Sequence, residues 1–425
     1  MRTVILTFII SLLSVCHAKA QLFSDYFVRK TLRVDYIFTG DANHQSIYLD
    51  GLSRLPLWAG REHHLAEAPL EGNGQVIVRE PDSKRCIYRT SFSSLFQEWL
   101  CTDEAKTTGK AFENTFLLPW PVRPVEVEVV LFDMNRKEVA SMKHTVKPDD
   151  ILIREKGAHP VAPHRYLMRN GSEDKAIDVV LLAEGYTPEE MDTFYNDARV
   201  ACGSIFSHEP FQSMKNKFNV IAVATPSADS GVSIPGRKLW KNTAFGSHFD
   251  TFYSARYLTT CRVKAIHDAL AGIPYEHIII LANTKQYGGG GIYNAFTLTT
   301  AHHPMFRPVV VHEFGHSFGG LGDEYFYEED VMSDMYPLNV EPWEQNITTL
   351  VDFDAKWKDM IEEGDCPVGI YEGGGYASKG IYRPADNCRM RSNDHPGFCP
   401  VCRRAIERLI RFYTEEEKGQ VEHHD

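Results

Sequence analysis

The feature that most constrains this fold is a change in the hydrophobic pattern near residue 176. Before that point apolar residues alternate with polar ones, as in residues 32–38 (LRVDYIF). Such alternation is typical of strands with one buried face, so we expect residues 21–147 to form an all-β sandwich. After that point, continuous apolar runs such as residues 177–183 (IDVVLLA) predict strands that are buried on both faces.

Strands and helices alternate in the second half of the chain. Apolar runs at residues 219–225 and 277–283 predict two further buried strands, with a helix over residues 261–271 between them. Residues 187–190 (TPEE) predict a helix start, with threonine as N-cap and the second glutamate closing a capping box. This alternation indicates a mixed, mostly parallel α/β sheet in a second domain, residues 174–415.

The ends of the chain and the segment between the two domains predict a signal peptide, a linker and a tail. Residues 1–20 predict a signal peptide, with cleavage after Ala20; a lipoprotein signal ending at Cys16 is the weaker alternative. We therefore expect an exported protein that is periplasmic, cell-surface bound or secreted. The proline- and charge-rich residues 148–173 predict a linker, and residues 416–425 a tail.

The charge balance and the hydropathy limit the partners. The chain has 57 acidic and 45 basic residues, a net charge of −12, which argues against nucleic acid as the main partner. Beyond the signal segment no apolar run reaches the length that spans a bilayer, so stable membrane insertion is not expected.

Nine cysteines become eight when Cys16 is removed with the signal. An even number in an exported chain favours disulfides, although connectivity does not follow from sequence. Neighbours in sequence suggest the local pairs Cys86–Cys101, Cys202–Cys261 and Cys366–Cys388, which leaves Cys399 and Cys402 over. Two alternatives exist for the last four cysteines: a Cys₄ zinc knot, or a redox pair in the motif CPVC at residues 399–402.

The segment VVVHEFGHSFGGLGDEY at residues 309–325 carries the strongest chemical signal. His312 and His316 are four residues apart, so on a helix both imidazoles leave the same face, as two ligands of one Zn²⁺ require. Glu313 lies about 100° around the helix from His312, where it would act on a water molecule rather than on the metal.

The third metal ligand must come from beyond the helix. Glycines 319–320 predict the helix end, and together with Gly322 they permit a turn back toward the metal. Asp323 is the first side chain after Gly322 that can bind zinc, and it is the favoured ligand. The alternatives are Glu324 and the more distant Glu328 and Glu329.

Three motifs together resemble one family. They are HEFGHSFGGLGDEY at residues 312–325, NCRM at residues 387–390 and FCPVC at residues 398–402. They are similar to the IgA-peptidase metallopeptidases (metallopeptidase family 64), metzincin-like zinc endopeptidases from bacteria. In ordinary metzincins the third ligand lies six residues after the second histidine, where this chain has Gly322; the departure is this family's own pattern.

The resemblance implies a fold and a site. The fold is α/β (α+β), a metzincin-like zinc peptidase domain preceded by an all-β accessory domain. One Zn²⁺ would be held by His312, His316 and Asp323, with Glu313 as general base and acid. Met390 would lie in a tight turn beneath the imidazoles, as in metzincins.

Two functions of different class follow. The first is a secreted zinc endopeptidase that cleaves an extended polypeptide, either immunoglobulin or another host or dietary protein. Tyr325 or Tyr382 would help to stabilise the oxyanion, and residues 287–300 form either a substrate-binding edge strand or a plain hairpin. The second is an inactive cell-surface module that binds protein or glycan, against which the intact glutamate of the HExxH motif argues.

Overall fold

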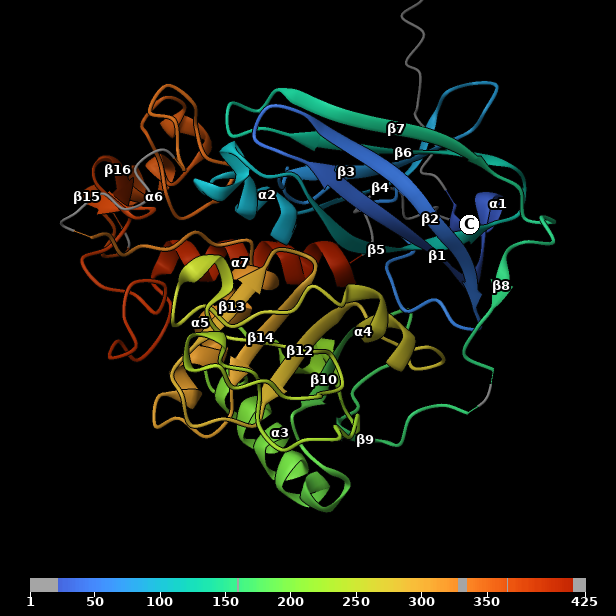
Figure 1. Cartoon of the computed structure of the whole chain (residues 1–425). Helices are drawn as coiled ribbons and strands as arrows, with labels where there is room; N and C mark the ends of the chain where they lie inside the picture. Colours follow the sequence, from blue (N-terminus) through green and yellow to red (C-terminus); the bar gives the residue numbers. More distant parts are fainter. Residues whose placement is uncertain (1–21, 159, 328–334, 365, 416–425) are drawn as a thin grey trace, which may run out of the picture.

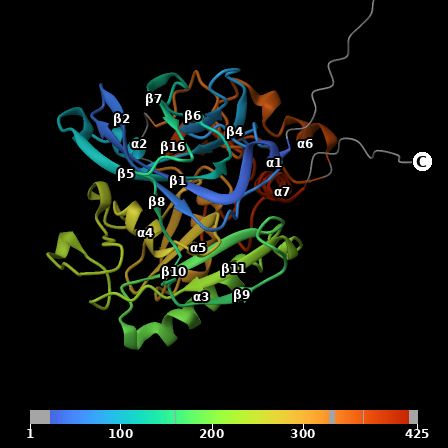
Figure 2. The ribbon, with the colours of Figure 1, turned by 90° about the vertical axis from the view of Figure 1, so that its right-hand side faces the viewer.

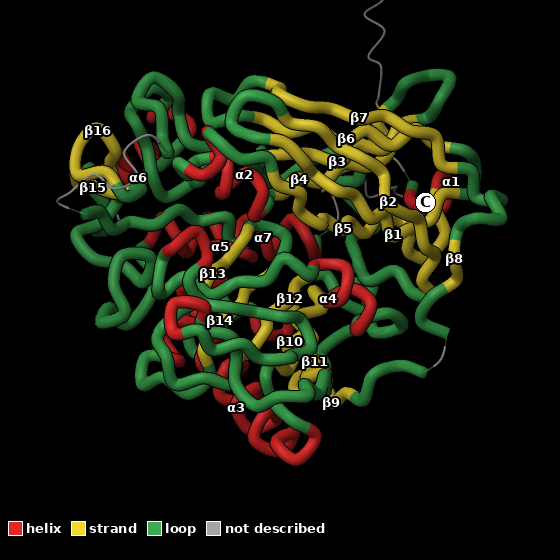
Figure 3. Tube along the Cα trace, viewed as in Figure 1, coloured by secondary structure: helices red, strands yellow, loops and turns green. Residues whose placement is uncertain are grey.

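The computed structural model describes residues 22–158, 160–327, 335–364 and 366–415 (Figure 1). The predicted signal segment, with Cys16, and the predicted tail at residues 416–425 lie outside this part of the chain. A β-rich region formed by the first half lies against a mixed α/β region formed by the second half (Figures 1 and 3).

The first half contains two four-stranded sheets. The first has the order β5-β1-β2-β8 and the second the order β4-β3-β6-β7. The bounds of these strands are β1 (Phe27–Gly40), β2 (Gln45–Leu55), β3 (Gly74–Arg79), β4 (Cys86–Phe92), β5 (Lys110–Pro121), β6 (Val125–Phe132), β7 (Glu138–Val146) and β8 (Arg154–Glu155). The short helices α1 (Phe23–Tyr26) and α2 (Leu95–Leu100) accompany them.

The two sheets pack face to face, as the alternating pattern predicts. Val34 and Phe38 on β1 and Val127 and Val129 on β6 are fully buried in one shared hydrophobic core. Tyr36 joins the two sheets, because its Oη lies 2.6 Å from His144 Nε2 on β7. The β-rich N-terminal half expected from the sequence is therefore present.

The second half is built on a six-stranded sheet of order β13-β14-β12-β10-β11-β9. Its strands are β9 (His164–Met168), β10 (Ile177–Glu184), β11 (Phe218–Val223), β12 (His277–Ala282), β13 (Gly289–Ile292) and β14 (Phe296–Thr300). The four central strands are parallel, and the edge strands β9 and β13 are antiparallel to their neighbours. Every residue of β10, β11 and β12 is buried, as continuous apolar runs predict.

Helices cover both faces of this sheet (Figure 2). On one face, α3 (Met191–Ile205), α5 (Phe306–Ser317) and α7 (Pro400–Thr414) share a core with Val179 and Leu181 of β10. On the other face, Val180 and Leu182 share a core with α4 (Val263–Ala269) that continues into the β-sandwich. The predicted capping box between Thr187 and Glu190 is formed just before α3. No helix among the described residues is both long and apolar enough to span a membrane.

The predicted linker carries two short strands. β8 pairs with β2 of the sandwich, and β9 pairs with β11 of the six-stranded sheet. Both strands lie at sheet edges. Residues 148–173 therefore connect the two halves and also extend one sheet in each of them, because each sheet offers an edge with unpaired backbone groups.

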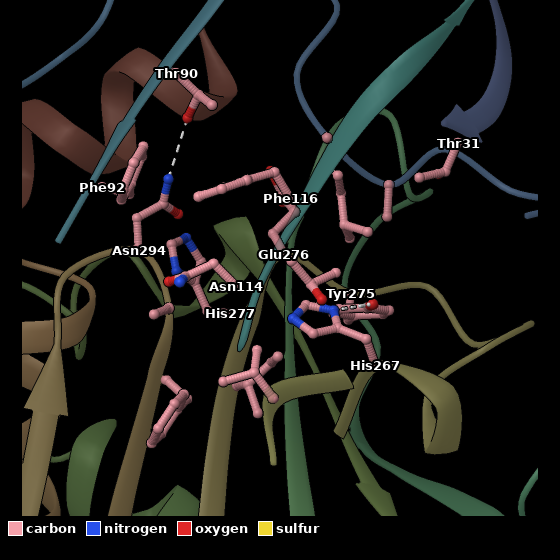
Figure 4. A pocket seen from close by; sticks show the side chains of 18 of the residues that line it. Thr31, Thr90, Phe92, Asn114, Phe116, His267, Tyr275, Glu276, His277 and Asn294 are labelled. Carbon is pink, nitrogen blue, oxygen red and sulfur yellow. Dashed lines mark hydrogen bonds between the residues drawn. The ribbon is translucent and has the colours of Figure 1, made fainter. Parts of the chain in front are cut away.

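The two halves are joined by polar contacts and enclose a cavity. Asn294 Nδ2 donates a 3.1 Å hydrogen bond to Thr90 Oγ1, and Arg33 forms a 2.6 Å ion pair with Asp268. The cavity has a volume of ≈ 110 Å³. Residues of both halves line it, among them Phe116 of the first half and Glu276 of the second (Figure 4). None of the HExxH residues lines it, so this cavity is separate from the predicted metal cluster.

The chain before α7 adds a small subdomain. It contains α6 (Lys358–Glu363) and the two-stranded sheet of β15 (Tyr371–Gly374) and β16 (Ala377–Arg383). This subdomain supplies one contact to the candidate active site, described below.

Candidate active site

Helix α5 packs closely on the edge strand β13. A Cβ atom at Gly291 would lie 2.2 Å from the backbone oxygen of Glu313, and one at Gly289 would lie 2.6 Å from Glu313 Oε1. Only glycine allows this approach without a shift of the helix or strand. Gly289 and Gly291 therefore determine how closely the HExxH turn of α5 lies against β13.

His312, His316 and Asp323 form a compact triangle of ligand atoms. His312 Nε2 lies 3.1 Å from His316 Nε2, and Asp323 Oδ1 lies 3.1 and 3.2 Å from the two nitrogens. Ligands about 2.0–2.1 Å from a tetrahedral zinc are separated by about 3.3 Å, close to these values. Asp323 Oδ1 is buried and accepts no hydrogen bond from any described residue. These atoms therefore fit a divalent cation.

Backbone carbonyls orient both imidazoles. His312 Nδ1 lies 3.0 Å from the carbonyl oxygen of Arg389, and His316 Nδ1 lies 2.6 Å from that of Leu321. Because a carbonyl only accepts, each Nδ1 carries a proton, and Nε2 is therefore the nitrogen through which each imidazole would bind a cation at the centre of the triangle. This arrangement is typical of metal-binding histidines.

The turn that returns Asp323 to the imidazoles depends on glycine. Helix α5 ends at Ser317, and Gly320 adopts a positive φ of +57°. The side chain of Asn346 then holds Gly322, accepting from its N–H at 2.8 Å and donating to its carbonyl at 2.9 Å. The chain thus turns back after the helix, as the glycine pattern predicts.

The structure separates the candidates for the third ligand. Asp323 contacts both imidazoles, whereas Glu324 Oε1 lies 3.1 Å from Cys402 Sγ and accepts a 3.0 Å hydrogen bond from Asn346. The two adjacent carboxylates therefore enter different sites. Glu328 and Glu329 lie outside the described residues.

Electrostatics hold the triangle in a charged state when no cation is present. Burial alone would raise the pKa of Asp323, but the two neighbouring imidazoles hold it well below its usual range. Burial alone would lower the pKa of His316, but the Asp323 carboxylate raises it to about 9. A carboxylate that stays ionised at neutral pH is suited to a metal ligand.

Tyrosines surround this carboxylate and its partner imidazole. Tyr376, between β15 and β16, donates a 2.5 Å hydrogen bond from its Oη to Asp323 Oδ2. The Tyr325 ring stacks on His312 with centroids 6.3 Å apart. Tyr382, the other predicted oxyanion donor, lies in β16, where its backbone pairs with Thr348. Sequence reasoning missed Tyr376, whose only signal was its place in a glycine-rich stretch.

Glu313 and Glu98 are acidic groups with raised pKa values. Burial raises the pKa of Glu313, and attraction to His312 and His316 offsets part of this effect. Burial also raises the pKa of Glu98 on α2 to about 7, while a hydrogen bond from Tyr257 Oη opposes the rise. Glu98 interacts electrostatically with His316 and Glu313, so the sandwich places an acidic group near the triangle. No pattern in the sequence indicates this contribution.

Met390 lies directly behind α5. It is fully buried, and a Cβ atom at Gly315 would lie 2.6 Å from its Sδ. A tight turn holds it, because the N–H of Arg391 donates a 2.9 Å hydrogen bond to the Cys388 carbonyl. The methionine thus packs against the helical turn between the two histidines.

The predicted edge strand is one arm of a hairpin. β13 pairs with β14 on one side, and on the other a bridge to Tyr257 occupies Gly289. Both expectations for residues 287–300 are thus partly met: the segment is a hairpin, and its outer strand forms a sheet edge. Part of this edge is therefore already paired and is not available to a substrate strand.

The preferred disulfide pairs are not formed in the structure. Cys101, Cys202, Cys261, Cys366, Cys388, Cys399 and Cys402 all carry free thiols. Proximity in sequence does not determine these pairs: Cys202 lies buried within α3, and Cys261 lies exposed before α4. The structure instead gathers Cys388, Cys399 and Cys402 around Glu324.

Comparison with known proteins decides the family. The profile described as IgA Peptidase M64 matches residues 166–368 and 364–410, and the profile described as Peptidase M64 N-terminus matches residues 22–143. This chain belongs to the IgA peptidase M64 family. A search of curated proteins finds no match to it. The resemblance drawn from the sequence motifs is confirmed, and membership of the M64 family makes the chain a peptidase whose substrate is a polypeptide.

Proposed function

We propose that this M64 peptidase is an exported zinc-dependent endopeptidase. The observation that carries the proposal is the triangle of His312 Nε2, His316 Nε2 and Asp323 Oδ1, in which the buried Asp323 oxygen accepts no hydrogen bond from the part of the chain that the structure describes. Zinc bound there would supply Lewis-acid polarisation of a peptide carbonyl and a lowered pKa for bound water.

Glu313 has the position and the proton affinity of a general base. It follows His312 on α5, and burial raises the pKa of its carboxyl. A base whose pKa lies nearer neutrality removes a proton from the attacking water and retains it long enough to deliver it to the leaving amine. Tyr325, whose ring stacks on His312, is the proposed oxyanion donor.

The proposed substrate is an extended segment of a folded or partly folded protein. Immunoglobulin and other host or dietary proteins are the candidates that the family resemblance supplies. The signal-like residues 1–20 support export to the periplasm, the cell surface or the medium, and the excess of acidic residues speaks against nucleic acid as a partner.

The test compares wild type with Glu313→Ala. We expect the variant to keep its zinc content and fold but lose cleavage of a peptide library by several orders of magnitude. Zinc is measured by mass spectrometry of the intact holoprotein and cleavage by product analysis, with and without chelator. Undiminished cleavage in Glu313→Ala would reject the mechanism. Absence of zinc-dependent cleavage in wild type would favour the alternative, an inactive module that binds protein or glycan.

A further inference from the structure

A second group of metal-binding side chains lies behind the candidate active site. Glu324, Cys388, Cys399 and Cys402 are all buried, with exposed fractions of 0, 0, 3 and 0%. Their ligand atoms lie within 4.8 Å of one another. They come from three segments: the turn after α5, the methionine turn and the start of α7.

The spacing of the sulfur atoms fits a metal better than a disulfide. Cys388 Sγ lies 3.8 Å from Cys402 Sγ. A disulfide requires about 2.05 Å, whereas two thiolates each about 2.3 Å from one tetrahedral zinc are about 3.8 Å apart. Three cysteines also cannot all be paired among themselves, so a disulfide would leave one thiol beside the carboxylate.

The environment of the Glu324 carboxylate gives a second, independent observation that favours a cation at this position. Its Oε1 accepts a hydrogen bond from Asn346 Nδ2, while its Oε2 is buried and has no partner among the described residues. It forms no ion pair with any described lysine, arginine or histidine. An uncompensated buried carboxylate is costly, and a cation beside it would offset that cost.

Backbone N–H groups point at the sulfur atoms. The N–H of Cys399 donates to Cys388 Sγ at 3.2 Å, and the N–H of Cys402 donates to Cys399 Sγ at 3.5 Å. Cys399 is the N-cap of the 15-residue helix α7, where the helix dipole also favours negative charge. The spacing of Cys399 and Cys402 is the C-x₂-C spacing of structural zinc sites.

We propose that Glu324, Cys388, Cys399 and Cys402 bind a structural Zn²⁺. The site is closed, because three thiolates and one carboxylate complete a tetrahedron and all four side chains are buried. It differs from the Cys₄ knot that the sequence suggests, because Glu324 takes the place of Cys366. The proposal stands whether or not the imidazole triangle binds zinc.

An ion bound at this site would stabilise the positions of the residues that form the candidate active site. Glu324 directly follows Asp323, and its N–H donates a 2.9 Å hydrogen bond to the Met390 carbonyl. The carbonyl of Arg389, next to Cys388, accepts the hydrogen bond that orients His312. A cation that joins Glu324 to Cys388 therefore fixes the relative positions of Asp323 and the carbonyl that orients His312.

The test uses the full chain, purified without chelator, and the double variant His312→Ala/His316→Ala. Removing the imidazoles abolishes the candidate catalytic site but leaves the thiolate site intact. We expect the double variant to retain one zinc per chain. After exchange with Co²⁺ it should show the thiolate-to-cobalt charge-transfer absorption that imidazole and carboxylate ligands cannot produce.

A second measurement needs no variant in the cluster. Iodoacetamide labelling of wild type, read by mass spectrometry, should modify Cys388, Cys399 and Cys402 only after chelation, while the exposed Cys101 reacts at once. A matched control, Cys101→Ser, should keep the full zinc content. Zinc-free His312→Ala/His316→Ala protein, or a disulfide within the cluster, would overturn the proposal. If the double variant and wild type each bound one zinc per chain, the thiolate site would be upheld. Only zinc binding by His312, His316 and Asp323 would then be contradicted.

Discussion

Tyr376 Oη donates a 2.5 Å hydrogen bond to Asp323 Oδ2, while Oδ1 of the same carboxylate lies against the two imidazoles. The phenol therefore fixes the rotation of the carboxylate from the side opposite the triangle. Such an outer partner typically changes metal affinity by about 10–100-fold when it is removed.

Tyr376→Phe is expected to weaken zinc binding by about 10–100-fold, because Asp323 loses the contact that holds its orientation. Competition with a fluorescent zinc chelator measures the effect in the intact protein. Tyr371→Phe, on the neighbouring strand β15 and 41% exposed, is the matched control and should bind zinc like wild type. Equal affinity in Tyr376→Phe and wild type would show that the hydrogen bond does not support the site.

Gly291→Ala is expected to lower activity strongly. The new Cβ would lie 2.2 Å from the Glu313 carbonyl and 2.9 Å from His316 Cβ, so α5 must move away from β13 and carry the HExxH residues with it. A fall in kcat/KM of about two orders of magnitude or more is the expected result, since small misplacements of catalytic groups can cost about 100-fold. The displacement of α5 results from a steric clash with the backbone of Glu313, which zinc cannot relieve. Saturating zinc should therefore not restore the rate.

The control for this glycine is Gly203→Ala. Gly203 is exposed within α3, and a Cβ added there would meet no described atom within 4 Å apart from its chain neighbours and the backbone of its own helix. Alanine is favoured over glycine in a helix by about 1 kcal/mol, so this variant should be slightly more stable and fully active. A similar loss of activity in both glycine variants would show that the effect of Gly291→Ala is not local.

Met390→Ala is expected to reduce the free energy of unfolding by about 2–5 kcal/mol, since it removes a fully buried side chain and leaves a cavity. Gly315→Ala alone should also destabilise, because its Cβ would lie 2.6 Å from Met390 Sδ. The double variant places the new methyl group in the space left by Met390. Its destabilisation, measured by urea unfolding, should be smaller than the sum of the two single changes. Strict additivity would mean that the helix and the methionine turn do not pack as described.

The sequence predicts the parts of this fold that depend on local pattern. The buried strands β10, β11 and β12, the capping box at Thr187 and the turn at Gly320 all follow from residue type and short spacing. The position of His312 and His316 on one helical face follows from the helix period alone. The preference for Asp323 over Glu324 rests on its place after the glycines, and the structure brings Asp323 to the imidazoles.

The parts that escape prediction depend on contacts distant in sequence. Tyr376 is separated from Asp323 by 53 residues. Glu98 lies on α2, in the β-rich first half of the chain, and interacts electrostatically with His316 and Glu313. The spacing of the cysteines makes Cys366 a candidate fourth ligand, but the structure gathers Glu324, rather than Cys366, beside Cys402. No periodicity marks such pairs, because tertiary packing rather than local geometry brings them together.

Asp178 gives a prediction about the pH dependence of stability. Its side chain is fully buried in β10, Oδ1 accepts a 3.0 Å hydrogen bond from Asn219, and Oδ2 has no partner among the described residues. Burial raises the pKa of Asp178 to about 7. The folded state therefore binds this proton more tightly than the unfolded chain, whose aspartates titrate near about 3.9.

The sign of the effect follows from this difference. The contribution of Asp178 to stability is fully present below the unfolded pKa and is lost as the pH rises toward about 7. Asp178→Asn cannot titrate, so its free energy of unfolding should change less than that of wild type between about pH 5 and about pH 8. Urea unfolding at both pH values measures this, with the exposed Asp82→Asn as control. An identical pH slope in Asp178→Asn and wild type would mean that the carboxyl is already ionised in the folded protein.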